Sequence, residues 1–317
     1  KVDAIVIVIV IIRIIMLFLP PLAAENIFNI GSLQVTNSMI NAFLALVIFV
    51  VFAFFINKGI KKYYVGDKAP KGLVNFFESI LEVILSQIDG VTHDRKKTLK
   101  FLPIVGGVFL FILISNWMGL LPGTGSIGIY RGEELKELVL PGTGSIGIYR
   151  GEELIPFLRP ANTDLNLTLA MAVFAVVLSH FVGIITIGFF KYTNKFIKLG
   201  DIWHAIKSGK PMNIMVAFIE FFVGLLEIIS EVAKMVSLSL RLFGNIFAGE
   251  VLLTVIGSLI AGYGALIIPL PFMALEILVG IIQAMVFSIL TLVYLSIATA
   301  EVHGHNQIDK NDMIEQH

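Results

Sequence analysis

The chain has 317 residues, of which 57% are hydrophobic and 15% are charged, and its mean hydropathy is +0.91. Soluble domains carry about 25% charged residues, so this composition all but excludes a water-soluble enzyme. The 23 basic and 23 acidic residues leave no net field for nucleic acid, and the absence of cysteine excludes disulfides and thiol chemistry. An all-α polytopic membrane protein, as a single membrane domain over residues 1–317, is the expected class.

The N-terminal segment, residues 1–24, is apolar and ends in Leu22-Ala23-Ala24. It is similar to a signal peptide, although Asp3 and Arg13 fit that pattern poorly. A retained extra helix is the alternative. The sequence leaves both open.

Four further apolar runs are long enough to cross a bilayer core about 30 Å thick, which needs about 20 residues per helix. Between the first and second of these runs, residues 73–88 are amphipathic and are expected to lie on the membrane surface. The predicted crossings are Ser38–Ile56, Phe101–Leu121, Leu165–Phe190 and Phe272–Ala300.

The stretch Met212–Ile268 is apolar for too long to be one ordinary crossing. We expect a shorter, partly in-plane helix there, followed by a long tilted helix. Pro269 and Pro271 then mark a turn into the last span. The whole chain would have about five to six transmembrane helices, with a long tilted C-terminal hairpin.

Lysine and arginine concentrate in two loops, residues 57–100 and 191–210. Because cytoplasmic loops are enriched in these residues, both loops and the C-terminus are predicted to be cytoplasmic. The expected location is the bacterial inner (plasma) membrane, as a multi-pass protein.

The predicted outer loop, residues 122–163, contains a duplication: Leu121–Leu135 (LPGTGSIGIYRGEEL) recurs letter for letter as Leu140–Leu154. Repeat architectures usually need about three copies. Two identical copies indicate a recent duplication in a tolerant loop, or a sequencing artefact. The glycines do not form a phosphate loop, since no Lys-Ser/Thr follows them.

A polar stripe lies around Arg241 if the region is a continuous helix with about 100° per residue. The stripe faces a protein partner or a water-filled cleft, and an arginine among apolar residues is costly unless compensated. Pairing of Arg241 with Glu227 or Glu231 is the purely structural alternative. The other members of the stripe are Lys234, Ser237 and Asn245.

Glu250 lies about 180° around the same helix from Arg241. On the last span, Glu276 and Gln283 share one face, and a tight hairpin would bring Glu250 level with Gln283 to Val286. Two carboxylates and an amide would then converge in the outer half of the membrane, where a protonatable carboxyl is suited to a proton relay.

Other polar residues carry weaker hypotheses. His180 lies within the run Leu165–Phe190, as a hydrogen-bonded interhelical residue or a relay member. Asp164 begins that run, as a helix cap or a cation funnel. Glu301, His303 and His305 are better explained by a charged tail than by a metal site. No catalytic, nucleotide-binding or cofactor-binding motif occurs, so no cofactor, metal or catalytic residue is expected.

The string SLSLRLFGNIFAGE (Ser237–Glu250) and the later IIQAMVFSILTLVYLSIA (Ile281–Ala298) resemble the a subunit family of F-type ATP synthases. The resemblance begins at about Ile27 and includes SNWMGLLPG (Ser115–Gly123). It implies a non-catalytic stator subunit in which residues 212–303 face a rotating c-subunit ring, with peripheral-stalk b subunits as further partners.

In that family, ions enter and leave the ring through two half-channels. The resemblance implies that Arg241 is the essential arginine between them and that Ser237 is a polar neighbour. It also implies that Asn245, Glu250, Glu276 and Gln283 line the outer half-channel. Some members carry histidine at the position of Glu276, so the proton wire differs in detail. The ion is expected to be H⁺, with Na⁺ left open.

Two other classes are weighed against this one. A proton-coupled secondary transporter would use an arginine facing carboxylates to bind its substrate, but the inverted hydropathy repeats typical of that class are not found. An intramembrane enzyme would need a nucleophile with its base, or metal ligands, within the spans, and none stands out.

Overall fold

A computed structural model describes residues 23–64, 72–121, 124, 128–140, 144–156, 158–196, 211–259 and 267–300. The chain divides into two compact units, and five of the described helices contribute residues to both. Unit 1 comprises residues 1–83, 106–171 and 238–288, and unit 2 comprises residues 84–105, 172–237 and 289–317. The predicted N-terminal signal or helix and the tail from Glu301 lie almost entirely outside the described residues, and they stay predictions.

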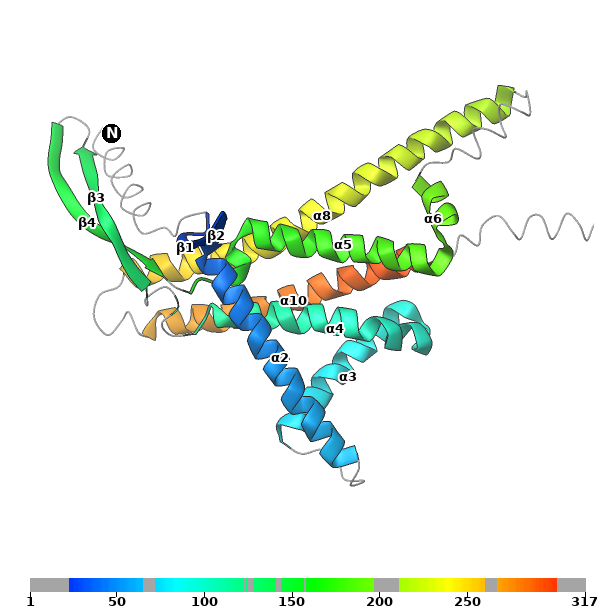
Figure 1. Cartoon of the computed structure of the whole chain (residues 1–317), viewed down its shortest axis with the longest axis horizontal. Coiled ribbons are helices and arrows are strands. Elements are labelled where there is room, and N and C mark those ends of the chain that lie inside the picture. The colour runs from blue at the N-terminus through cyan, green and yellow to red at the C-terminus, as the bar shows by residue number, and fades with distance from the viewer. Residues whose placement is uncertain are drawn as a thin grey trace, which may run out of the picture. The chain divides into compact units, whose positions relative to one another are not determined.

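Helices make up most of the described chain (Figure 1). By length and hydropathy, α2, α4, α5 and α10 can each cross a membrane, which confirms the polytopic helical class and the four predicted runs. The helices are α2 Asn37–Tyr64, α3 Leu73–Thr92, α4 Arg95–Met118, α5 Leu165–Ile187, α6 Phe189–Phe196, α8 Pro211–Leu259 and α10 Pro269–Thr299.

The prediction of two helices within residues 212–268 is wrong, because α8 is one continuous helix of 49 residues. Its only proline, Pro211, occupies the first turn, where a missing N–H costs no helical hydrogen bond. No other proline interrupts it, and isolated glycines such as Gly244 are too weak to break a long helix. At 1.5 Å per residue, α8 is about 74 Å long, well over twice a bilayer core.

Two helix boundaries also differ from the prediction. The run predicted as Leu165–Phe190 ends at Ile187, because Gly188 has a φ of +97° and turns the chain into α6. The last helix begins at Pro269, since both prolines of the predicted turn fall in its first turn.

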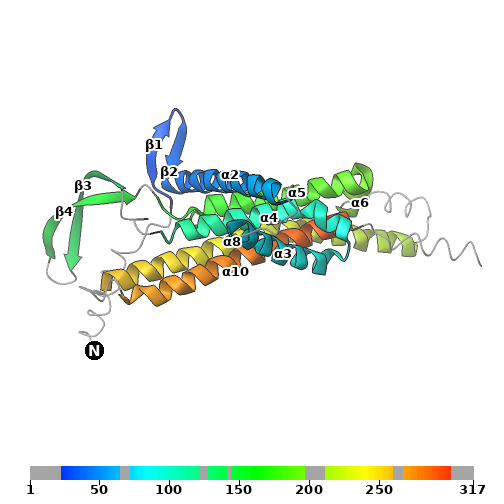
Figure 2. The same cartoon turned by 90° about the horizontal axis from the view of Figure 1, so that it is seen from below.

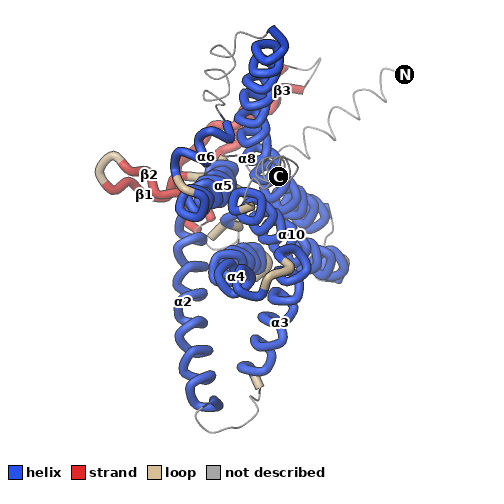
Figure 3. Tube along the Cα trace, turned by 90° about the vertical axis from the view of Figure 1, so that its right-hand side faces the viewer, coloured by secondary structure: helices blue, strands red, loops and turns tan. Residues whose placement is uncertain are grey.

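The described strands form two antiparallel hairpins, both in unit 1. β1 (Asn26–Ile30) pairs with β2 (Leu33–Thr36), which leads into α2 (Figure 3). Within the outer loop, β3 (Gly128–Leu140) pairs with β4 (Gly144–Pro156), so the strands carry parts of the two copies of the duplicated segment. Glu133 pairs with Glu152, its counterpart in the second copy. The short helix η1 (Ala161–Thr163) then leads into α5.

In unit 1, the second part of α8 and the first part of α10 run side by side (Figure 2). The end of α4 is joined to α10 by two side-chain donors: Asn116 Nδ2 donates to the Gly280 carbonyl at 3.1 Å, and Trp117 Nε1 donates to the Ile277 carbonyl at 3.4 Å. Apolar side chains from these three helices are buried in unit 1, among them Ile112, Leu242, Ile246, Ala284 and Phe287.

Candidate functional site

The α8–α10 pair brings together several of the predicted site residues. Asn245 Nδ2 donates to Gln283 Oε1 at 2.6 Å. Closer to the α8–α10 connection, Gly249 faces the Glu276 carboxylate so closely that an added Cβ would lie 2.0 Å from Glu276 Oε2. Glu250 on α8 therefore lies beside the turn of α10 that carries Glu276. The predicted neighbours, Gln283 to Val286, begin about two helical turns further along α10.

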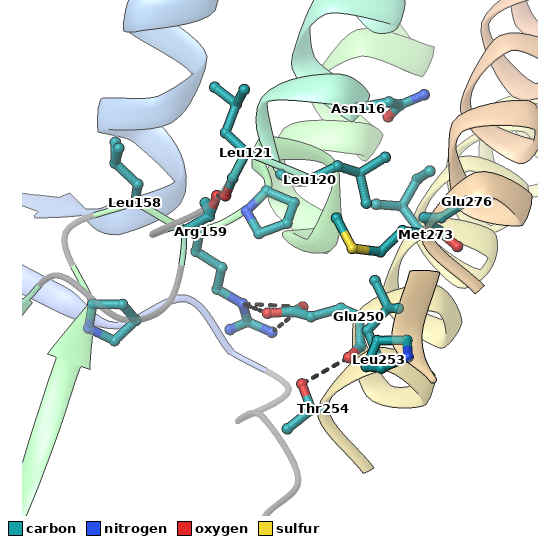
Figure 4. A pocket seen from close by; sticks show the side chains of 16 residues that line it. Asn116, Leu120, Leu121, Leu158, Arg159, Glu250, Leu253, Thr254, Met273 and Glu276 are labelled. Carbon is teal, nitrogen blue, oxygen red and sulfur yellow. Dashed lines mark hydrogen bonds and ion pairs between the residues drawn. The ribbon is translucent and has the colours of Figure 1, made fainter. Parts of the chain in front are cut away.

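Glu250 and Glu276 line a common cavity of about 330 Å³ in unit 1, called the carboxylate cavity below (Figure 4). Its wall comes from the end of α4, the segment before η1, and the facing parts of α8 and α10. Gln283 is not among its lining residues, so the predicted convergence holds for the two carboxylates, while the amide bonds to Asn245 instead. Other members of the wall are Asn116, Leu120, Arg159, Ile246 and Met273.

Within the carboxylate cavity, Glu250 is held by Arg159 (Figure 4). Arg159 Nε donates to Glu250 Oε1 at 3.2 Å and Nη2 donates to Oε2 at 3.2 Å. The side chains of Arg159 and Glu250 are 3% and 18% exposed. Such a two-point contact fixes the carboxylate in orientation.

Arg159 is itself fixed by its surroundings. Its Nη1 donates to the Ala23 carbonyl at 3.1 Å, and its own carbonyl accepts a hydrogen bond of 2.6 Å from Asn41 Nδ2 on α2. Sequence reasoning missed this residue, because it lies in a loop outside any helical period and 91 positions before Glu250. The available signal was a lone basic residue between Pro156 and Pro160, next to an apolar span.

Glu276 differs from Glu250 in its electrostatic surroundings. Within the described part of the chain, no hydrogen bond or ion pair reaches its carboxylate, which lies half-buried on the cavity wall. A carboxyl group with space beside it and no fixed cation can exchange its proton more readily than one held by an arginine. The cavity therefore contains one ion-paired carboxylate, that of Glu250, and one carboxylate that is available for proton exchange, that of Glu276.

Arg241 is exposed on α8, as are Ser237 and Asn245, one turn away on either side. Among the described residues of unit 1 it makes no hydrogen bond and no ion pair, and the alternative of a pair with Glu227 or Glu231 stays a prediction. Arg241 does not line the carboxylate cavity. Arg241 therefore lies exposed on α8 with two polar neighbours, Ser237 and Asn245.

The secondary candidates have structural partners. Asp164 is buried, accepts a hydrogen bond of 2.9 Å from the Asn166 amide, and accepts another of 2.7 Å from Ser38 Oγ, so it caps α5 and links it to α2. In unit 2, Glu231 contacts both Lys234 and His180. Glu227 lies nearby and acts electrostatically on Tyr192.

These observations define a polytopic helical membrane protein with ionisable residues around a partly open cavity and an exposed arginine, Arg241, on α8. Residues 38–296 match the family model described as ATP synthase A chain. The chain belongs to this family. Membership makes it a membrane-sector subunit of ATP synthase rather than the catalytic one.

Individual relatives agree with the family match. ATP synthase subunit a of Campylobacter jejuni subsp. doylei is 32% identical over 236 residues, which cover 74% of this chain and 80% of the relative. ATP synthase subunit a of Mycobacterium ulcerans is 29% identical over 274 residues, covering 86% and 90%. ATP synthase subunit a 2 of Syntrophotalea carbinolica is 28% identical over 255 residues, covering 80% and 84%.

Proposed function

We propose that this chain is the ion-translocating stator subunit of a rotary ATP synthase, with two half-channels that carry protons to and from a carboxylate on the c-ring. The observation that carries the proposal is Arg241, which is exposed on α8 and has no partner within the described residues. Family membership supplies the partner that such a residue needs, since a c-ring carboxylate complements its charge.

An arginine suits the barrier between the half-channels for physical reasons. Its guanidinium stays protonated at any relevant pH, so Arg241 attracts the ring carboxylate but relays no proton itself. One charge crossing 100 mV releases about 2.3 kcal/mol. A leak past Arg241 would dissipate that energy without turning the ring.

The outer half-channel in this proposal uses the α8–α10 pair. Protons enter the carboxylate cavity, where Glu276 exchanges them and Glu250 is held by Arg159. Asn245 and Gln283, joined by their 2.6 Å hydrogen bond, continue the polar route toward the ring. Ser237 provides a hydroxyl one turn from Arg241 on the exposed face of α8.

The remaining assignments follow from the same role. The partners are the c-ring, the peripheral-stalk b subunits and the lipid bilayer. The location is the bacterial inner membrane, with the C-terminus cytoplasmic. The transported ion is H⁺, and a ring built for Na⁺ would change the ion without changing Arg241.

The experiment compares Arg241→Ala with Leu240→Ala in inverted membrane vesicles carrying the complete complex. Leu240 is the matched control because it is adjacent, exposed and apolar. We expect Arg241→Ala to abolish ATP-driven proton pumping and coupled synthesis, while Leu240→Ala retains both. Near-normal coupling in Arg241→Ala would refute the proposed barrier.

A further inference from the structure

Unit 2 contains a cluster of ionisable side chains that the proposed barrier and carboxylate cavity do not use. His180 on α5 lies between two partners: its Nδ1 is 2.6 Å from the Tyr192 hydroxyl on α6, and its Nε2 is 3.6 Å from Glu231 Oε2 on α8. Lys234 Nζ donates to Glu231 Oε1 at 2.7 Å. These four residues are called the His180 cluster below.

Local chain geometry builds this cluster. The left-handed backbone at Gly188, with a φ of +97°, turns the chain from α5 into α6 and allows α6 to fold back. The Tyr192 ring then packs over Gly183, where an added Cβ would lie 2.5 Å from the ring and 2.7 Å from the Ala298 carbonyl of α10. The glycine thus makes room for the ring, whose hydroxyl ends at His180.

The hydrogen-bond roles follow from the chemistry of Tyr192. Burial raises its pKa to about 12, and the nearby Glu231 and Glu227 contribute to the rise. The phenol therefore keeps its proton, and it can donate that proton to Nδ1 when His180 is neutral with Nδ1 unprotonated. The imidazole proton then lies on Nε2, directed at Glu231.

The elements packed around His180 place charged and polar groups near its ring. α8 presents Glu231 and Glu227 with one cation, Lys234, and α6 presents a neutral phenol. On α10, the Tyr294 ring lies 5.5 Å from Lys234 Nζ and draws that cation by a cation–π contact. At 3.6 Å, the gap between Nε2 and Glu231 exceeds a normal hydrogen bond and can tighten when the imidazole becomes charged.

We propose that the His180 cluster is a proton-binding station of the ion path, with His180 as the group that takes up and releases the proton. The proposal rests on the proposed function. On uptake, a proton bonds to Nδ1, the Tyr192 oxygen changes from donor to acceptor, and the imidazolium faces Glu231. Release reverses these changes, and no other bond is made or broken.

The test measures passive and ATP-driven proton flux in vesicles carrying the complete complex, over a pH range around 6.5, the usual pKa of an imidazole. In His180→Gln, the amide oxygen can still accept from Tyr192 and its NH₂ group can still donate to Glu231, but the side chain binds no proton. We expect a pH-dependent step in wild-type flux and its loss in His180→Gln, with the assembled complex present in normal amount.

Two further variants separate proton binding from packing. Tyr192→Phe retains the ring over Gly183 but removes the hydroxyl that bonds Nδ1, so the midpoint of the flux–pH curve should move from its wild-type position. Thr193→Val is the matched control, because this exposed hydroxyl on α6 donates only to the Phe189 carbonyl. Its flux–pH curve should equal that of the wild type.

The proposal is overturned if His180→Gln keeps the wild-type flux–pH curve. It is also overturned if His180→Gln and Tyr192→Phe lower flux equally at every pH, since that result assigns the cluster to packing alone. Arg241→Ala, measured in the same membranes, tests the proposed function separately. Retained coupling in Arg241→Ala would remove that function whatever His180→Gln does.

Discussion

Arg159 and Glu250 form a two-point ion pair in unit 1, with 3.2 Å between Nε and Oε1 and 3.2 Å between Nη2 and Oε2. The pair joins the loop before η1 to α8, and Arg159 also contacts the Ala23 carbonyl. It thereby fixes one carboxylate of the cavity, whereas Glu276 opposite has no such cation within the described residues. We therefore expect the two glutamates to differ in function: Glu250 is ion-paired with Arg159, and Glu276 is available for proton exchange.

Breaking the pair from one side is expected to destabilise the protein. Arg159→Met leaves the Glu250 carboxylate buried without its cation, and loss of one partner of a buried ion pair costs about 3–5 kcal/mol. The double variant Arg159→Met with Glu250→Gln removes both charges and should recover much of that loss. The measurement is a double-mutant cycle on the thermal stability of the purified complex. Strictly additive losses would show that the two residues do not interact.

The two carboxylates should differ when neutralised singly. Glu276→Gln and Glu250→Gln are each expected to slow proton flux, while the complex still assembles. Glu250→Gln should also lower stability, because Arg159 is then left buried without its anion, whereas Glu276→Gln breaks no described contact. Passive proton flux and thermal midpoints measured together separate these effects. Met273→Leu, an apolar change in the same wall, is the control.

Wild-type flux in both carboxylate variants would exclude the outer relay. Equal loss of stability in both would contradict the asymmetry between the paired and the available carboxylate.

The absence of a side chain at Gly249 leaves room for the Glu276 carboxylate. A Cβ at Gly249 would lie 2.0 Å from Glu276 Oε2, so Gly249→Ala must displace the carboxylate, which is the movable end of a flexible side chain. Alanine favours a helix more than glycine does, so α8 itself should remain intact. We expect slower proton flux with normal assembly. Gly257→Ala, on the same helix with no neighbour within 4 Å of its Cβ, should behave as wild type.

The sequence predicts the spanning helices well because apolar runs near 20 residues leave few alternatives in a bilayer. α2 and α5 begin within one residue of their predicted starts, Ser38 and Leu165. The continuity of α8 was harder to predict. Hydropathy suggests a break to fit the bilayer thickness, although α8 holds no internal proline that would produce one.

The sequence predicts the site residues well where the helical period alone determines on which side of a helix a residue lies. The separation of Arg241 from Glu250 on α8 follows from nine residues at about 100° each, and Glu250 lines the carboxylate cavity while Arg241 does not. The level of Glu250 against α10 was not predictable, because it depends on the tilt and connection of two helices. Neither Arg159 nor the contact of His180 with Tyr192 has a periodic signal, since each depends on a turn or loop that folds back.

The Tyr192 hydroxyl should titrate later than an ordinary tyrosine. Burial, with Glu231 and Glu227 nearby, raises its pKa from 10.0 to about 12, and the neutral phenol is the form that the folded chain favours. Its contribution to stability is therefore fully present below about pH 10 and is lost as the pH rises through about 12. The measurement is alkaline titration of phenolate absorbance for the purified complex, as a difference between wild type and Tyr192→Phe. The difference curve should have its midpoint near 12, and a midpoint near 10 would contradict the buried placement of Tyr192 beside His180.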